Sequence, residues 1–259
     1  MLPKFIPLLF LICLACKQKN ISSIIEIENS RQTAKAENPY KTIADIPLPA
    51  GYKRINYDAG TFAAWLRKVS LKKDKTVYTY DGNKKYNQAA QFAVLDVSVG
   101  KQNLQQCADA VMRLRAEYFY DIKNFNQIRF TDNDGASYNF QSPFTRTHFD
   151  TYLLHVFGMC GSASLQKQLK QHVEMKDIET GDVLIRGGFP GHAVIVMDVA
   201  FNNVGKKIYM LAQSYMPAQD IHVLVNPVNK LLSPWYEVND ETKIKTPEYV
   251  FTMYELKRW

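Results

Sequence analysis

The stretch from residue 181 to residue 199, GDVLIRGGFPGHAVIVMDV, decides the fold of this chain. It predicts one strand, a tight Gly/Pro turn and a second strand with His192 at its mouth. Gly191 leaves room for close approach beside the imidazole, which is a common way to present a catalytic histidine. The chain also carries Cys107 at the predicted start of a helix. Cysteine with histidine is the minimum for nucleophilic catalysis by a thiol.

Outward from this hairpin, the pattern predicts helices early in the chain and antiparallel strands late, which is typical of an α+β fold. The expected helices are 62–69, 104–120, 149–156 and 165–173. The expected strands are 76–80, 91–99, 127–130, 136–140, 183–185, 193–201, 207–212, 221–225 and 250–256. The turn at 203–205 predicts a hairpin between two of the late strands.

The helix predicted over 104–120 has Asn103 as its expected N-cap and Gln106 as capping-box partner. Cys107 then lies in the first turn, where the positive end of the helix dipole lowers a thiol pKa and favours the nucleophilic thiolate. The side-chain amides of Gln105 and Gln106, just upstream, are candidates for holding an oxyanion. Cys107 also lies on the apolar stripe of its helix, so a buried core cysteine is the alternative.

Cys160 is the other cysteine of the mature body, in a turn before the helix expected at 165–173. A disulfide between Cys107 and Cys160 is possible in an exported protein and would remove both nucleophiles. The sequence leaves this open.

His192 needs a partner that orients its ring. Asp198 shares its strand face but stands about 20 Å away along an extended strand. The hairpin turn at 203–205 would instead bring residues 213–216 back beside the mouth, with Gln213 as the polar candidate. The competing interpretation is a surface histidine in a turn.

The first residues are expected to be removed before folding. Residues 1–15 combine Lys4 with an apolar run too short to span a bilayer, which needs about 20 residues. Leu14-Ala15-Cys16 resembles a bacterial lipobox, with Cys16 as the lipidated first mature residue. A plain secretory signal is the alternative. With the lipid, the protein would be anchored in the cell envelope, at the outer membrane, rather than spanning it.

Residues 16–46 are polar and poorly periodic, and they are expected to be a flexible tether. Residues 47–259 leave about 210 residues, which suits one domain with a sizeable core. The formal charge of +7 is spread along the chain, so it indicates surface charge and not a nucleic-acid site.

No metal or cofactor is expected. The histidines lack metal-ligand spacing, the one CxxC lies in the signal region, and no phosphate or dinucleotide loop is visible. Trp235 and Tyr236 are more typical of core, although exposed rings there would suit stacking on a glycan.

Three segments, 105–118, 187–194 and 213–219, resemble a family of exported bacterial lipoproteins, the domain of unknown function 4846. This resemblance covers about residue 49 to residue 259, and it implies membership without implying an activity.

A more distant resemblance supplies chemistry. Gly181-Asp182-Val183, leading to residues 191–196, is similar to the NlpC-type and CHAP cell-wall peptidases. Those have papain-like folds with a cysteine on a helix, a histidine on a strand and a polar residue on the next strand. The resemblance implies Cys107 as nucleophile, His192 as general base and Gln213 as orienter. The expected function is therefore a lipid-anchored cysteine hydrolase or amidase acting on peptide amides of cell-wall material. The alternative is a non-catalytic envelope lipoprotein that binds a glycan or peptide in the same cleft.

Overall fold

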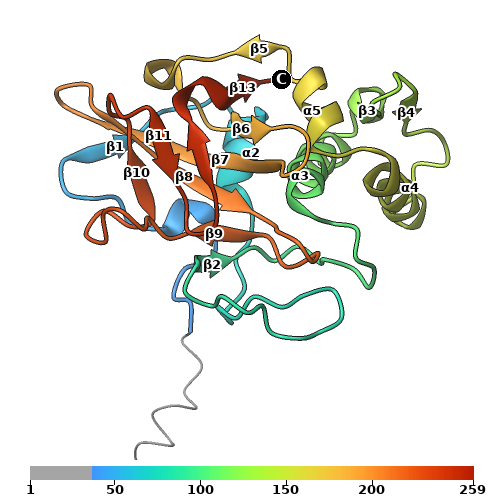
Figure 1. The fold of residues 1–259 in the computed structure, drawn as a ribbon, viewed down its shortest axis with the longest axis horizontal. Coiled ribbons are helices and arrows are strands. Elements are labelled where there is room, and N and C mark those ends of the chain that lie inside the picture. The colour runs from blue at the N-terminus through green and yellow to red at the C-terminus, as the bar shows by residue number, and fades with distance from the viewer. Residues whose placement is uncertain (1–36) are drawn as a thin grey trace, which may run out of the picture. The chain divides into compact units, whose positions relative to one another are not determined.

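The late strands form a large antiparallel sheet in the computed structural model, which describes residues 37–259 (Figure 1). Its order is β2-β9-β8-β7-β6-β13-β5, with β1 added on β7 and β10 on β8. In chain order its strands are β1 (Tyr52–Arg54), β2 (Gln91–Val94), β5 (Gln171–His172), β6 (Val183–Arg186), β7 (His192–Asn202), β8 (Lys207–Gln213), β9 (His222–Leu224), β10 (Trp235–Glu237) and β13 (Leu256–Arg258). The predicted hairpin joins β7 to β8.

Helices cover one face of this sheet and a small hairpin covers the other. The helices are α2 (Phe62–Lys68), α3 (Cys107–Asp121), α4 (Arg146–Met159) and α5 (Ser162–Gln168). Single 3-10 turns are η1 (Ile43–Asp45), η2 (Phe125–Gln127), η3 (Met175–Asp177) and η4 (Met253–Glu255). The covering hairpin pairs β11 (Lys243–Lys245) with β12 (Val250–Thr252), and a second hairpin pairs β3 (Arg129–Thr131) with β4 (Ser137–Asn139). Figure 1 shows α4 and the β3–β4 hairpin together at one end of the sheet. The α+β prediction is confirmed.

The central strand β7 is buried on both faces, which explains its continuous apolar run. Ala193 and Ile195 pack in the core beneath the helices, whereas Val194 and Val196 pack beneath the β11–β12 hairpin. A bulge near Asp198 shifts the β7–β8 register, so the strict alternation expected along the strand ends there.

The helix expected at 104–120 begins three residues later, at Cys107, because Asn103 does not cap it. The side chain of Asn103 instead accepts a hydrogen bond from the backbone N–H of Ala218, at 2.8 Å. Gln106 is the N-cap, and its backbone N–H donates to Asp109 at 2.9 Å. The expectation for Asn103 and for Gln106 as box partner was therefore wrong, although Cys107 still lies in the first turn.

Other differences are local. Residues 76–80 form only isolated bridges, because the backbone N–H of Tyr78 donates to the Asp220 carboxylate rather than to a strand. The strand expected at 250–256 is divided by η4 into β12 and β13. The helix expected at 165–173 begins at Ser162 and ends at Gln168.

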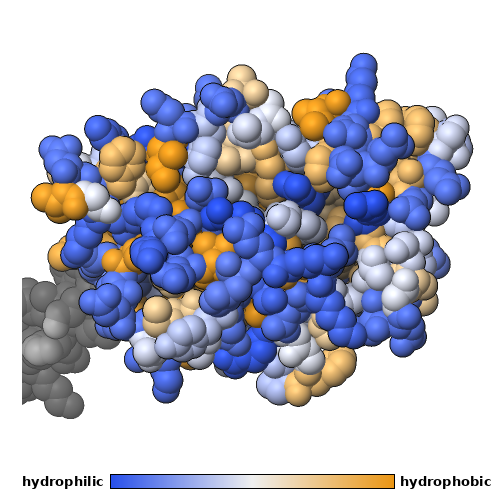
Figure 2. All heavy atoms as spheres, turned by 90° about the horizontal axis from the view of Figure 1, so that it is seen from above, coloured by the Kyte–Doolittle hydropathy of each residue, from blue (hydrophilic) through white to orange (hydrophobic). Residues whose placement is uncertain are grey.

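The predicted domain boundary at residue 47 falls inside a compact unit that runs from Asn38 to Trp259. Ile43 and Ile46 are fully buried in its core, so the last part of the expected tether is structured. The expected signal and Cys16 lie outside the described residues. Among residues 37–259, no helix is long and apolar enough to cross a membrane. The face in Figure 2 is mostly hydrophilic, with hydrophobic side chains in small separate groups.

Candidate functional site

Cys107 is the first residue of α3, and its thiol lies against the start of β7. α3 packs on β7, and the backbone N–H of Ala193, directly after His192, is close enough to the sulfur to lower the pKa of the thiol, as are the N–H groups of Cys107 and Ala108. The side chain is 7% exposed, and within the part of the chain that the structure describes it forms no disulfide. The packing of α3 on β7 thus brings the cysteine to the strand position that carries the histidine.

His192 opens β7, and its ring is held by the last residue of β8. His192 Nε2 and Gln213 Oε1 are 2.8 Å apart, and both residues are 1% exposed. The hairpin therefore places Gln213 beside the mouth of β7. Asp198 takes no part in this contact, because its carboxylate accepts from Arg54 at 2.6 Å and from Arg67 at 2.7 Å.

A buried polar network continues from Gln213. Its amide nitrogen donates to Glu248 Oε2 at 2.8 Å, and Lys85 Nζ donates to the same oxygen at 2.7 Å. Lys85 Nζ also lies 3.4 Å from His222 Nε2, and His222 Nδ1 donates to the carbonyl of Asp220 at 2.9 Å. The network links loops from three parts of the chain to the candidate site.

This network fixes the tautomer of His192. A carboxylate only accepts hydrogen bonds, so Gln213 must turn its NH₂ group toward Glu248 and its carbonyl oxygen toward His192. His192 Nε2 therefore carries the proton of the neutral ring. The other nitrogen, Nδ1, is left unprotonated and available as a base.

Burial keeps the Cys107 thiol and the His192 imidazole uncharged at neutral pH. Burial, followed by the nearby Asp109 carboxyl, raises the pKa of Cys107 to about 11 despite the backbone donors around the sulfur. Burial lowers the pKa of His192 to about 4, although the hydrogen bond to Gln213 opposes this. The expected lowering of the thiol pKa by the helix dipole was therefore wrong, because desolvation outweighs the amide donors.

Aromatic rings cover the imidazole. The ring centroids of Tyr215 and Tyr249 each lie 4.9 Å from that of His192, and Phe251 stacks on it at 5.7 Å. The hydroxyl of Tyr249 donates to the carbonyl of Pro190 at 3.2 Å, which ties the β11–β12 turn to the loop before His192. These contacts leave the His192 side chain buried, with 1% of its surface exposed.

The other residues that the sequence singled out, Gln105, Gln106 and Cys160, differ in their hydrogen-bond partners. Gln105 is buried, and its amide nitrogen has no hydrogen-bond partner among residues 37–259, while its oxygen lies 3.5 Å from a guanidinium nitrogen of Arg113. The amide of Gln106 is directed to Asn103, at 3.3 Å, and is not free to hold an oxyanion. Cys160 is a buried free thiol among the described residues, and burial raises its pKa to about 11.

Sequence reasoning missed Lys85, Tyr249 and Glu248. Glu248 and Tyr249 lie in the turn between β11 and β12, and nothing in the sequence indicated that this turn lies over His192. The prediction that Trp235 and Tyr236 belong to the core is confirmed, because both rings are buried and neither is exposed for stacking on a glycan. Within the described residues, no cluster of three or more His, Cys, Asp or Glu side chains could hold a metal ion.

The fold and site define an α+β protein with a buried His192–Gln213 pair at the mouth of the β7–β8 hairpin and with Cys107 at the start of the helix that packs on β7. The chain belongs to the family described as domain of unknown function (4846), which matches residues 43–145 and 141–258. No curated protein and no solved structure shows significant similarity to it.

Proposed function

We propose that this chain is a cysteine hydrolase or amidase that acts on peptide amides of cell-wall material. One observation carries the proposal: Cys107 begins a helix that packs against the strand opened by His192, and Gln213 on the next strand holds the imidazole. The same order of helix, strand and next strand is found in the NlpC-type and CHAP peptidases, so the papain-like core belongs to this proposal.

The chemistry follows from the tautomer. His192 Nδ1 accepts the Cys107 proton while the sulfur bonds to the amide carbonyl carbon, and the carbonyl electrons move to oxygen. Collapse of this intermediate breaks the C–N bond, and the amine leaves with the proton from His192. Water then attacks the thioester, giving one proton to His192, which returns it to the sulfur as the acid is released.

The developing oxyanion needs donors that are already in place. The first backbone N–H groups of a helix lack intrahelical partners, and α3 presents them at Cys107. The unpartnered amide nitrogen of Gln105 is the one side-chain donor among the two predicted glutamines that is not committed elsewhere. We therefore assign the oxyanion to the start of α3, with Gln105 as the auxiliary donor.

The second candidate function is a non-catalytic binding lipoprotein. It is favoured by the raised thiol pKa and by the aromatic cover, which together describe an unreactive core cysteine. In that case Cys107→Ser lowers stability while binding of a glycan or peptide persists.

The lipid anchor is part of the proposal. A lipobox-like Leu14-Ala15-Cys16 supports lipidation at Cys16 and attachment at the cell envelope. Metabolic labelling with a fatty-acid analogue tests it, since Cys16→Ala should abolish incorporation and Cys13→Ala should not.

The test of the activity is release of new amino groups from isolated peptidoglycan by the chain and by Cys107→Ala. Cys160→Ala is the matched control, because it removes another buried free thiol outside the site. Loss of release in Cys107→Ala alone, with unchanged thermal unfolding, is the expected result. A fully active Cys107→Ala protein would exclude the mechanism.

A further inference from the structure

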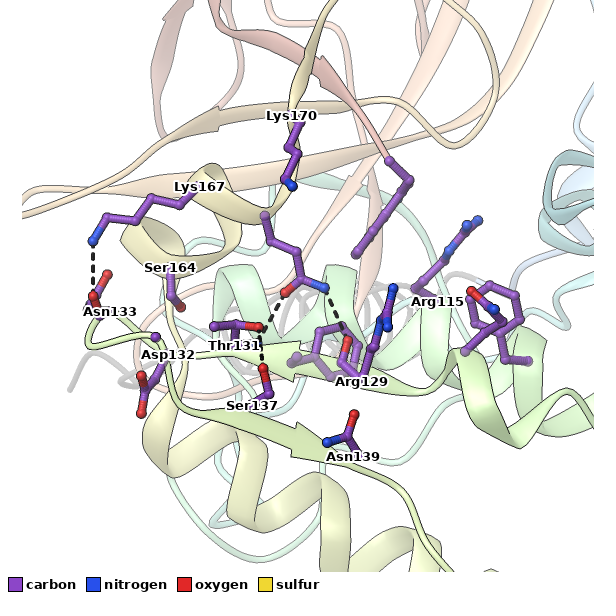
Figure 3. A pocket seen from close by; sticks show the side chains of 16 residues that line it. Arg115, Arg129, Thr131, Asp132, Asn133, Ser137, Asn139, Ser164, Lys167 and Lys170 are labelled. Carbon is purple, nitrogen blue, oxygen red and sulfur yellow. Dashed lines mark hydrogen bonds between the residues drawn. The ribbon is translucent and has the colours of Figure 1, made fainter.

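A second hollow lies away from Cys107, between the β3–β4 hairpin, α5 and the end of the chain (Figure 3). It has a volume of about 750 Å³, within the range of small-molecule sites. Arg115, which lines it, lies about 12 Å from Cys107 along the axis of α3. This pocket is therefore distinct from the Cys107–His192 centre.

The pocket is strongly basic. Its lining has one acidic side chain, Asp132, and four cationic side chains: Arg115, Arg129, Lys167 and Lys170. Asp132 is occupied by the hydroxyl of Tyr138 at 2.8 Å and by backbone N–H groups of its own turn. Among residues 37–259, none of the four cations forms an ion pair with a carboxylate. Asp132 is therefore the one acidic side chain in the lining, and its carboxylate already accepts hydrogen bonds from its own hairpin.

Arg115 is the most buried of the four cationic side chains. Its guanidinium is placed over the rings of Phe62, Phe119 and Trp259, at 4.7, 4.6 and 5.1 Å from their centroids. Its Nε and the indole nitrogen of Trp259 are shielded from water and have no hydrogen-bond partner in the described part of the chain. Burial lowers the pKa of Arg115 to about 10, so the group stays charged at neutral pH at an energetic cost that a nearby anion would offset.

The walls of the pocket are fixed by hydrogen bonds. The amide of Gln168 on α5 accepts from the backbone N–H of Thr131 at 3.2 Å and donates to the carbonyl of Arg129 at 3.1 Å. Figure 3 shows the side chains of Arg129 and Lys170 pointing into the space from opposite walls. Thr131, Ser137 and Asn139 add hydroxyl and amide groups to the lining. The backbone that carries Arg129 and Thr131 is therefore held against α5, while the side chains of Arg129, Lys167 and Lys170 are exposed to solvent.

We propose that this pocket binds a small multivalent oxyanion, a carboxylate or phosphate compound, between Arg129 and Lys170. Guanidinium and ammonium groups recognise both kinds of oxyanion through charge-assisted hydrogen bonds. The size of the pocket favours an organic anion over a single inorganic ion.

Calorimetric titration of the full chain with pyrophosphate and with citrate tests the proposal, and sodium chloride at matched ionic strength gives the baseline. Saturable binding of either probe is expected, and the probe that binds identifies phosphate or carboxylate as the source of charge. Arg129→Gln combined with Lys170→Gln should weaken binding at least about tenfold, because each removes a charge-assisted contact. Thermal unfolding checks that this variant folds.

Lys101→Gln combined with Lys230→Gln is the matched control, since both lysines are exposed and neither lines the pocket. It removes the same net charge and should leave the affinity within about twofold. The proposal is overturned if neither probe binds, or if both double variants weaken binding equally.

Discussion

Removing the negative charge of Glu248 should strongly destabilise the folded chain. Its carboxylate is the shared acceptor of Lys85 and Gln213, and the Lys85 and Glu248 side chains are only 6% and 13% exposed. In Glu248→Gln the ammonium group stays in this enclosed site without a counter-charge. Breaking a buried pair on one side costs about 3 kcal/mol or more in the free energy of unfolding.

A double variant measures the interaction energy between Lys85 and Glu248 separately from the effect of each single substitution. Lys85→Met with Glu248→Gln removes both charges, so its loss of stability should be smaller than the sum of the two single losses. We expect a coupling energy of about 2 kcal/mol between the two positions.

Urea denaturation at pH 7 measures all four proteins, and an unchanged dependence on urea shows that the transition stays comparable. A loss below about 1 kcal/mol in Glu248→Gln would be typical of an exposed ion pair. That result would show that the buried network contributes little to holding Gln213 against His192.

Two further predictions concern the histidines and their cover. The pKa values of His192, about 4, and His222, about 3, are both below 6.5, so each folded ring stays neutral while the unfolded ring gains a proton. Their contribution to stability is present above pH 6.5 and is lost as the pH falls toward 4, by about 1.4 kcal/mol per pH unit for each ring. His222→Gln should remove one such slope in urea denaturation between pH 6 and pH 4.5, and an unchanged slope would contradict the assignment. Tyr249→Ala should speed native-state alkylation of Cys107 by at least about tenfold by opening the cover. The exposed Tyr254→Ala is its control, and equal rates in the two variants would show that the cover does not limit access.

The sequence allowed the central part of the fold to be predicted, because β7 and β8 are long apolar runs separated by a clear turn. The same pattern brought residues 213–216 back to the mouth of the first strand, and the polarity of Gln213 singled it out as the partner of His192. The N-terminus of α3 was misplaced because Asn103 is bonded to Ala218, a partner distant in the chain. Such long-range competition for a capping side chain leaves no local signal.

The direction of the pKa shift of Cys107 also could not be predicted from the sequence. A helix dipole can be inferred from a helix start, but the desolvation that reverses its effect on Cys107 depends on how completely α3, β7 and the cover enclose the sulfur. Lys85 and Glu248 are separated by most of the domain, and each is an ordinary loop residue in its own context. Only the packed structure shows that they fix the amide of Gln213.

The most direct test of a Cys107–His192 pair is the relative rate at which iodoacetamide labels Cys107 and Cys160 in the native chain, followed for each cysteine by peptide mass spectrometry. Both thiols are buried, and both have pKa values raised to about 11, so Cys160 is an internal control for burial. We expect Cys107 to react at least about tenfold faster at pH 7, through local opening that lets His192 take its proton, and to lose this advantage in His192→Ala. Equal labelling of the two cysteines, unaffected by His192→Ala and limited by global unfolding, would identify Cys107 as a core residue and contradict the catalytic assignment.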